Sequence, residues 1–174
     1  ADGSMTRRFA SAIAMVFVVA LTLTGQGTAD AVDSAAKAAP ARLIIPKTGT
    51  NAAVIRVPVK NGNLMIGHRL QGTVYTAKNG DPPCDPTGST MYAAHTWKAG
   101  HGTADDWVIL KKGDLIRVGG CKFRVTKKEK WSDDRPIGSL SSPDGPPRIV
   151  LYACWPTDYD FAQVVFARKV KNKR

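Results

Sequence analysis

The sequence predicts an all-β domain, folded as a closed barrel or a sandwich. Short apolar runs rich in β-branched residues recur along the chain, and glycine and proline separate them. No segment has the periodicity of a long amphipathic helix, although residues 102–110 leave room for one or two helical turns. Residues 41–174 are enough for one domain with a core of its own.

The expected strands are short and closely spaced. They cover residues 42–46, 53–57, 73–76, 90–97, 107–110, 114–118, 121–126, 149–154 and 162–168. Residues 131–147 form a long connection that is rich in proline and glycine toward its end. A connection of that length in a compact domain is often functional.

The N-terminal part is expected to direct export rather than to fold into the domain. Residues 1–4 precede the first methionine and are interpreted as a cloning scar. Residues 5–31 begin with two arginines, continue with an uncharged apolar stretch and end in a small-x-small pattern, as a signal peptide does. The stretch is also long enough for an uncleaved anchor, which needs about 20 residues. Residues 32–40 are small and polar, as in a linker, and both alternatives place the remaining chain outside the cytoplasm.

The formal net charge of +11 first suggests a nucleic-acid partner. Lysine and arginine are scattered, however, apart from residues 127–130 and 168–174, and no nucleic-acid motif accompanies them. We therefore expect no nucleic-acid partner. For an exported protein, an anionic wall polymer or phospholipid fits the charge better, and a basic surface without a dedicated ligand is the remaining alternative.

Three cysteines in an exported domain leave one outside any single disulfide. Cys84 lies in a turn-rich loop and Cys121 opens an expected strand, so these two are plausible disulfide partners. The remaining cysteine is then Cys154. A Cys/His metal site is the alternative, but no two cysteines have the spacing of metal ligands, so we expect no metal and no cofactor.

Cys154 ends the apolar run of residues 148–154, and Pro156, which cannot continue a ladder, follows two places later. A thiol at the rim of a strand is a candidate nucleophile, whereas a small buried hydrophobic side chain is the alternative. His95 ends a similar run. Because thiolate is the nucleophile and a neighbouring imidazolium stabilises it, the two strand ends predict a Cys–His pair.

Four segments carry a family resemblance, and they follow one another along the chain as residues 41–54, 88–97, 107–118 and 149–154. Together they resemble sortases, most closely the short actinobacterial class often called class F. The second segment contains His95, and the fourth ends at Cys154 with Ala153 where the family usually has threonine. The resemblance implies an eight-stranded sortase β-barrel with short helical turns, in which Cys154 is the nucleophile and His95 lies beside it.

The resemblance also implies an arginine at the start of the last strand, and here this sequence departs from the family. Asp160 or Ala162 stands at that position, depending on the register. Arg168 shares the strand face of Ala162 and is taken as the third member of the site, although six residues of strand span roughly 20 Å. A different register of this strand, or a loop that carries Arg135 or Arg69 across, is the alternative.

By this resemblance the chain is a cysteine transpeptidase at the cell surface or cell wall of a Gram-positive bacterium. It is expected to cleave a Leu-Pro-x-Thr-Gly-like sorting signal through a thioester on Cys154 and to join the protein to a cell-wall amine. Trp155, Ala153 and Trp97 are expected to contact the peptide, with the Trp155 N–H available to the carbonyl oxygen. The expected partners are surface proteins with sorting signals, the wall amine and, through an uncleaved anchor, the membrane.

Two other functions stay open at this stage. The missing arginine favours a catalytically impaired sortase-fold module that binds sorting-signal peptides without processing them. A different cysteine hydrolase or transpeptidase that acts on wall peptides would use the same Cys–His pair, and hydrolysis without amine transfer would distinguish it.

Overall fold

The computed structural model describes residues 41–97, 100–132 and 134–171. A boundary after Lys37 sets off a unit of residues 38–174, to which all described residues belong. The expected cloning scar, signal peptide or anchor, and linker lie outside the described residues. Within the described part of the chain, no helix is long and apolar enough to cross a membrane.

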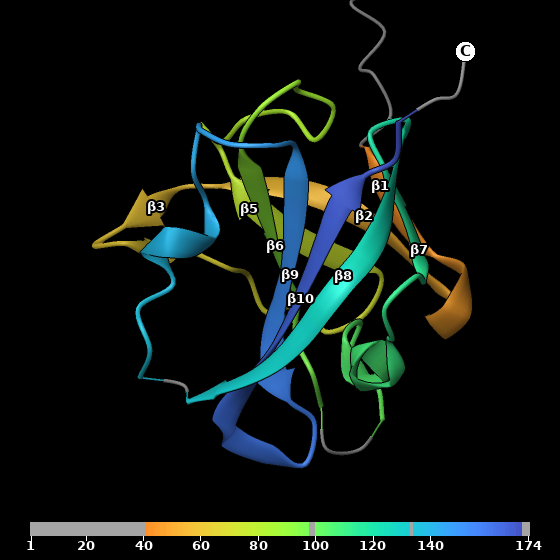
Figure 1. The fold of residues 1–174 in the computed structure, drawn as a ribbon. Helices are drawn as coiled ribbons and strands as arrows, with labels where there is room; N and C mark the ends of the chain where they lie inside the picture. Colours follow the sequence, from red (N-terminus) through yellow and green to blue (C-terminus); the bar gives the residue numbers. More distant parts are fainter. Residues whose placement is uncertain (1–40, 98–99, 133, 172–174) are drawn as a thin grey trace, which may run out of the picture. The chain divides into compact units, whose positions relative to one another are not determined.

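Eight strands close into a barrel in the order β1-β2-β5-β6-β9-β10-β8-β7 (Figure 1). They are β1 (Arg42–Ile45), β2 (Thr50–Val57), β5 (Thr73–Ala77), β6 (Ser89–Ala93), β7 (Leu115–Val118), β8 (Cys121–Ser132), β9 (Arg148–Trp155) and β10 (Asp158–Lys169). Pairing of Leu43 with Val118 closes the barrel between β1 and β7. The pairs β2–β5 and β6–β9 are parallel, and the other pairs are antiparallel. The predicted all-β, eight-stranded barrel with short helical turns is confirmed.

A small hairpin outside the barrel was not predicted. It consists of β3 (Val59–Lys60) and β4 (Asn63–Leu64). Asn61 and Gly62, which join the two strands, have φ angles of 51° and 77°. A two-residue hairpin turn of this kind needs positive φ at both positions, and Asn-Gly is its strongest sequence signal.

The helical elements are three short 3-10 helices, η1 (Pro46–Thr48), η2 (Asp105–Ile109) and η3 (Gly138–Leu140). The strand predicted at 107–110 is therefore wrong, because periodicity does not distinguish a short apolar run from a buried helical turn. The Asp105 carboxylate accepts hydrogen bonds from the backbone N–H groups of Trp97 and Gly102, at 2.7 and 2.8 Å. These bonds hold the connection between β6 and η2 in place.

The sheet is hydrophobic on both faces around β9. Ile149, Leu151 and Ala153 belong to the core inside the barrel. The alternate residues Val150 and Tyr152 contribute to a second cluster on the outer face. This outer cluster also contains Leu64, Met91, Trp131, Ile137, Leu140, Val164 and Phe166. Since side chains alternate along a strand, Cys154 follows Val150 and Tyr152 onto the outer face.

The predicted disulfide between Cys84 and Cys121 is confirmed, with their Cα atoms 5.7 Å apart. It joins the loop between β5 and β6 to the first residue of β8. The compact unit from residue 38 therefore contains every barrel strand, both hydrophobic clusters and the disulfide.

Candidate active site

A pocket of about 350 Å³ lies where β6 and β9 end, and Cys154 and His95 both line it. Its remaining walls are Asn63, Leu64, Ile66, Met91, Ala93, Ala94, Asp134, Arg135, Pro136, Ile137, Tyr152 and Ala153. The predicted pair is therefore brought together, although the two residues are far apart in sequence.

The parallel pairing of β6 with β9 explains how the pair is assembled. Ala93 is in register with Tyr152, and the Ala94 N–H donates to the Tyr152 carbonyl oxygen at 3.1 Å. His95 and Cys154 each come two residues after that last registered pair. Parallel strands end at the same edge of a sheet, so the two side chains reach the same pocket. Cys154 lies outside the disulfide and is partly exposed.

His95 lies just beyond the end of β6 at Ala93, rather than inside the strand predicted over residues 90–97. Its Nε2 atom is 2.6 Å from the backbone oxygen of Gly67. A carbonyl oxygen only accepts hydrogen bonds, so Nε2 carries a proton and Nδ1 is the nitrogen that can exchange one. The Tyr75 ring meets the imidazole edge to face, with the centroids 6.1 Å apart.

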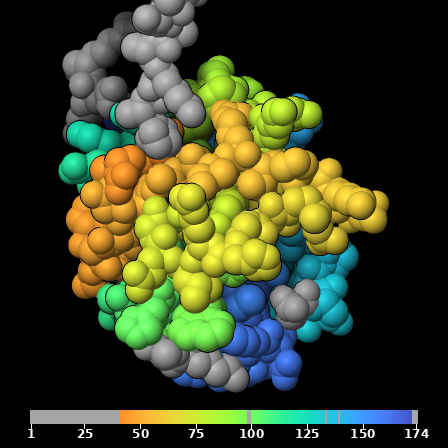
Figure 2. Space-filling model, turned by 180° about the vertical axis from the view of Figure 1, so that it is seen from behind, coloured from red at the N-terminus to blue at the C-terminus, as the bar shows by residue number. Residues whose placement is uncertain are grey.

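The chain segment that supplies Gly67 connects β4 with β5. It lies on the face of the molecule seen in Figure 2, where the yellow part of the chain stands between the orange N-terminal strands and the blue end of β9 and β10. Asn63, Leu64 and Ile66 of this region line the pocket. The connection therefore holds His95 in place and also forms one wall of the site.

Ala162 of β10 is the register partner of Cys154, and Trp131 of β8 is the next residue across the sheet. The Arg135 guanidinium stacks on the Trp131 ring, 3.7 Å from its centroid, and Arg135 lines the pocket. From the sequence, Arg135 was only an alternative to Arg168 as the third member of the site. A cation thus reaches the pocket from the loop after β8 instead of from β10.

Glu129 fixes the ring on which Arg135 stacks. Its Oε2 accepts a hydrogen bond from Trp131 Nε1 at 2.7 Å, and its Oε1 pairs with Lys127 Nζ at 2.7 Å. The hydrogen bonds from Lys127 and Trp131 lower the pKa of the Glu129 carboxyl. Trp131 is thereby held in one orientation for the stacking with Arg135.

Arg168 does not reach this pocket. It lies near the other end of β10, in register with Arg148 on one side and Arg124 on the other. Its side chain lines a different cavity, together with Lys122 and Lys169. The structure therefore gives no support to its assignment as the third member of the site.

The three residues expected to contact the peptide have different surroundings. Ala153 lines the pocket and is buried. Trp155 is half-buried, and Lys130 Nζ lies 5.1 Å from its ring centroid. Trp97 is 47% exposed. Neither tryptophan is among the residues that line the pocket.

No group of three or more His, Cys, Asp or Glu side chains with the arrangement of a metal site occurs in the described part of the chain.

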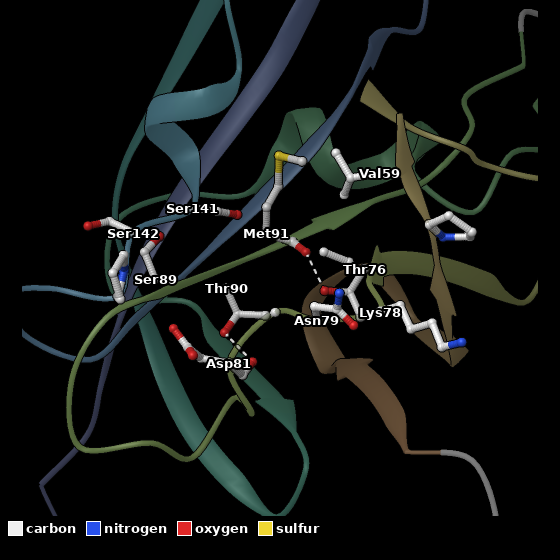
Figure 3. A pocket seen from close by; sticks show the side chains of 14 residues that line it. Val59, Thr76, Lys78, Asn79, Asp81, Ser89, Thr90, Met91, Ser141 and Ser142 are labelled. Carbon is white, nitrogen blue, oxygen red and sulfur yellow. Dashed lines mark hydrogen bonds between the residues drawn. The ribbon is translucent and has the colours of Figure 1, made fainter. Parts of the chain in front are cut away.

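A second cavity, of about 660 Å³, adjoins the first along β6, and Met91 lines both (Figure 3). It opens where β5 and β6 diverge, because these strands pair only through Tyr75 and Ala93. Thr76 Oγ1 bridges the gap with a 2.8 Å hydrogen bond to the Met91 carbonyl oxygen. The two cavities together run along the outer face of β6.

Solved structures of sortases have the same fold. The sortase A of Listeria monocytogenes is 18% identical, with a TM-score of 0.60 over 77% of this chain and 88% of that chain. Sortase C-1 from Actinomyces oris is 21% identical, with a TM-score of 0.61 over 75% and 73%. The Clostridium perfringens Sortase D5 transpeptidase is 14% identical, with a TM-score of 0.59 over 76% and 79%.

No protein-family model and no curated protein sequence matches the chain. The resemblance to class F in particular stays a prediction. The closed barrel of this chain has the sortase fold.

Proposed function

We propose that the protein is a cysteine transpeptidase of the sortase type. The observation that carries the proposal is the meeting of Cys154 and His95 in one pocket, at the ends of two adjacent parallel strands of a sortase-fold barrel. The substrate would be a peptide with a Leu-Pro-x-Thr-Gly-like sorting signal, and the acceptor an amine of the cell wall. An apolar wall that includes Leu64, Met91 and Ile137 suits the leucine and proline of such a signal.

The reaction follows from the chemistry of the pair. The Cys154 thiolate attacks the carbonyl carbon before the cleaved bond, and the C–N bond breaks as His95 gives a proton to the leaving amine. The product is a thioester between the acyl fragment and Cys154. An acceptor amine then attacks the thioester carbonyl, His95 takes its proton, and Cys154 leaves as thiolate. The Gly67 carbonyl holds Nε2, so the proton moves through Nδ1.

In this proposal, Arg135 is the cation that stabilises the carbonyl oxygen of the substrate. Its guanidinium stacks on the Trp131 ring, and Arg135 lines the pocket with Cys154. Ala162, opposite Cys154, has only a methyl group and offers no cation of its own. Negative charge that develops on the carbonyl oxygen favours a fixed cation and N–H donors beside it.

The place of action in this proposal is the outer face of the plasma membrane or the cell wall. Its support is the sequence pattern of residues 5–31, which predicts a signal peptide or an anchor.

A peptide assay with and without an amine tests the proposal. A Leu-Pro-x-Thr-Gly peptide panel is incubated with the protein, and products are separated by chromatography and identified by mass. We expect a new product that joins the acyl fragment to the amine, and none with Cys154→Ala. Hydrolysis of the peptide that is the same with and without the amine would indicate a hydrolase. Peptide binding without any product would indicate a binding module.

A further inference from the structure

The barrel carries a concentration of positive charge at the end opposite to Cys154. Arg148, Arg168 and Arg124 stand in register on the adjacent strands β9, β10 and β8. Residues directly opposite each other in a ladder share one face of the sheet, and like charges so placed destabilise the pairing. Three arginines in one row are therefore a cost to the fold unless an anion lies against them.

The described residues do not neutralise this row. The ion pairs among them are Lys127–Glu129 and Lys130–Asp158, so none involves the three arginines. Arg124 donates to the Gly113 carbonyl oxygen at 2.8 Å. The Nε atom of Arg148 is buried and has no hydrogen-bond partner within the described part of the chain.

A cavity of about 600 Å³ continues the positive surface. Its charged lining residues are Lys122, Arg168, Lys169 and Lys171, and no acidic side chain lines it. Asp85 and Asp144 belong to the loops before β6 and β9, and neither lines the cavity. We call the surface formed by Lys122, Arg124, Arg148, Arg168 and Lys171 the basic end.

Acidic side chains at the other end of the barrel include Asp105 and Asp106 of η2, Asp134 after β8, and Asp158 and Asp160 of β10. Asp81 and Asp85 before β6 and Asp144 before β9 lie in loops at the basic end, where basic side chains outnumber them. A surface with such an excess of positive charge can orient the domain on an anionic surface as well as attract it.

The chain also enters the barrel at the basic end. The start of β1 and the end of β10 lie together at the top of Figure 1, and β9 ends at the bottom. Cys154 is the last residue but one of β9. Leu43 pairs with Val118, and the Val170 N–H donates to the Lys122 carbonyl oxygen at 2.8 Å. The apolar stretch within residues 5–31, which predicts an anchor or signal, precedes this entry point in the sequence.

We propose that the basic end docks on a membrane surface of anionic phospholipid. Lipid headgroups carry phosphates, for which arginine pairs provide matching donors. An anionic leaflet attracts lysine and arginine clusters of this size. Docking would turn the Cys154 pocket away from the membrane. The proposal stands independently of the chemistry at Cys154.

Vesicle co-sedimentation of residues 38–174 tests the docking without the N-terminal apolar stretch. We expect binding to vesicles with roughly one third phosphatidylglycerol, none to pure phosphatidylcholine, and release between about 0.1 and about 0.5 M salt. Each basic residue at an anionic surface contributes roughly five-fold in affinity, so the double variant Arg148→Gln/Arg168→Gln should bind about thirty-fold more weakly.

The matched control is Lys111→Gln/Lys112→Gln, which removes the same charge from the exposed connection between η2 and β7. Equal loss in both double variants would show attraction by net charge alone and would overturn the proposal. So would binding to soluble glycerol-phosphate polymer but not to vesicles. If the arginine variant does not fold, Lys122→Gln/Lys171→Gln provides the same comparison.

A second experiment measures how the docked domain is oriented on the membrane. All four tryptophans, at positions 97, 107, 131 and 155, belong to the end of the barrel that carries Cys154. Docking through the basic end predicts that brominated phosphatidylglycerol leaves their fluorescence nearly unchanged while the protein is bound. Strong quenching would mean that the Cys154 end faces the bilayer, which contradicts the proposal.

Discussion

Ala162 lies directly opposite Cys154 in the antiparallel ladder of β9 and β10, and Trp131 follows on β8. The position across from the thiol therefore has no functional group of its own. Arg135 reaches the same pocket by stacking on Trp131, 3.7 Å from the ring centroid. The resemblance to sortases implies an arginine on the last strand, whereas the arginine that lines this pocket belongs to the loop after β8.

Arg135→Ala is expected to lower kcat/KM for a sorting-signal peptide by about 100- to 1000-fold, the usual cost of removing a donor from a developing oxyanion. Stability should change little, because Arg135 is exposed. Steady-state cleavage of a fluorogenic peptide measures the effect.

Arg69→Ala removes an exposed arginine that does not line the pocket and is the matched control. Adding Ala162→Arg to the Arg135→Ala variant should restore part of the activity, because it places a cation opposite Cys154. Equal activity of Arg135→Ala and Arg69→Ala would remove Arg135 from the mechanism.

Glu129→Gln is expected to destabilise the protein at neutral pH but not at low pH. The hydrogen bonds from Lys127 and Trp131 lower the pKa of the Glu129 carboxyl. A group whose pKa is lowered in the folded state contributes stability above its unfolded pKa, about 4.3, and this contribution is lost as the pH falls through the folded pKa. Thermal unfolding is measured from about pH 7 to about pH 3. The Tm of Glu129→Gln should be lower than that of the wild type at neutral pH, and the two Tm values should converge toward low pH.

Asp144→Asn, on an exposed loop, makes the same change of charge and is the control. A Tm difference for Glu129→Gln that stays constant over the whole pH range would contradict the role given to the carboxylate.

Removal of the disulfide by Cys84→Ser/Cys121→Ser is expected to destabilise the domain by about 4 kcal/mol, because the bond closes a long loop of the unfolded chain. That corresponds to a fall in Tm on the order of 10 °C for a domain of this size. Thermal unfolding with and without reductant measures it. Reductant should lower the Tm of the wild type and leave that of the double variant unchanged, and a Cys154→Ser variant should behave like the wild type.

Thr50→Val is expected to cost about 1–3 kcal/mol, because it leaves the indole N–H of a buried residue without an acceptor. Trp107 is completely buried, and its Nε1 donates to Thr50 Oγ1 at 3.2 Å. Chemical unfolding measures the loss, and Thr50→Ser, which keeps the hydroxyl, should recover most of it. Similar losses for both variants would show that the hydroxyl is not the acceptor that matters.

Much of the barrel could be predicted because runs of β-branched and aromatic residues, bounded by glycine and proline, mark strands in the sequence. The run that ends at Cys154 is rich in β-branched and aromatic residues, and it forms β9 as expected. The disulfide could be predicted because an exported domain with three cysteines allows few pairings. Residues 107–110 were misassigned because apolar content alone does not separate a strand from a buried helical turn.

The third member of the site could not be predicted in the same way. Its position depends on the register between β9, β10 and β8, which no local pattern around Ala162 reveals. Arg168 shares a strand face with Ala162, yet it lies at the basic end. Arg135 belongs to the loop after β8, which lines the pocket through Asp134, Pro136 and Ile137 as well, and the path of such a loop is not readable from the sequence.

Intact-mass spectrometry shows directly whether Cys154 forms a thioester with a sorting-signal peptide. The protein is mixed with a Leu-Pro-x-Thr-Gly peptide without an amine, and the reaction is stopped with acid. We predict an added mass equal to the acyl fragment and mapped to Cys154. It should be absent in Cys154→Ala, strongly reduced in His95→Ala, and lost when an amine is added. Measurable peptide binding with no adduct on Cys154 at any time would contradict the thioester route.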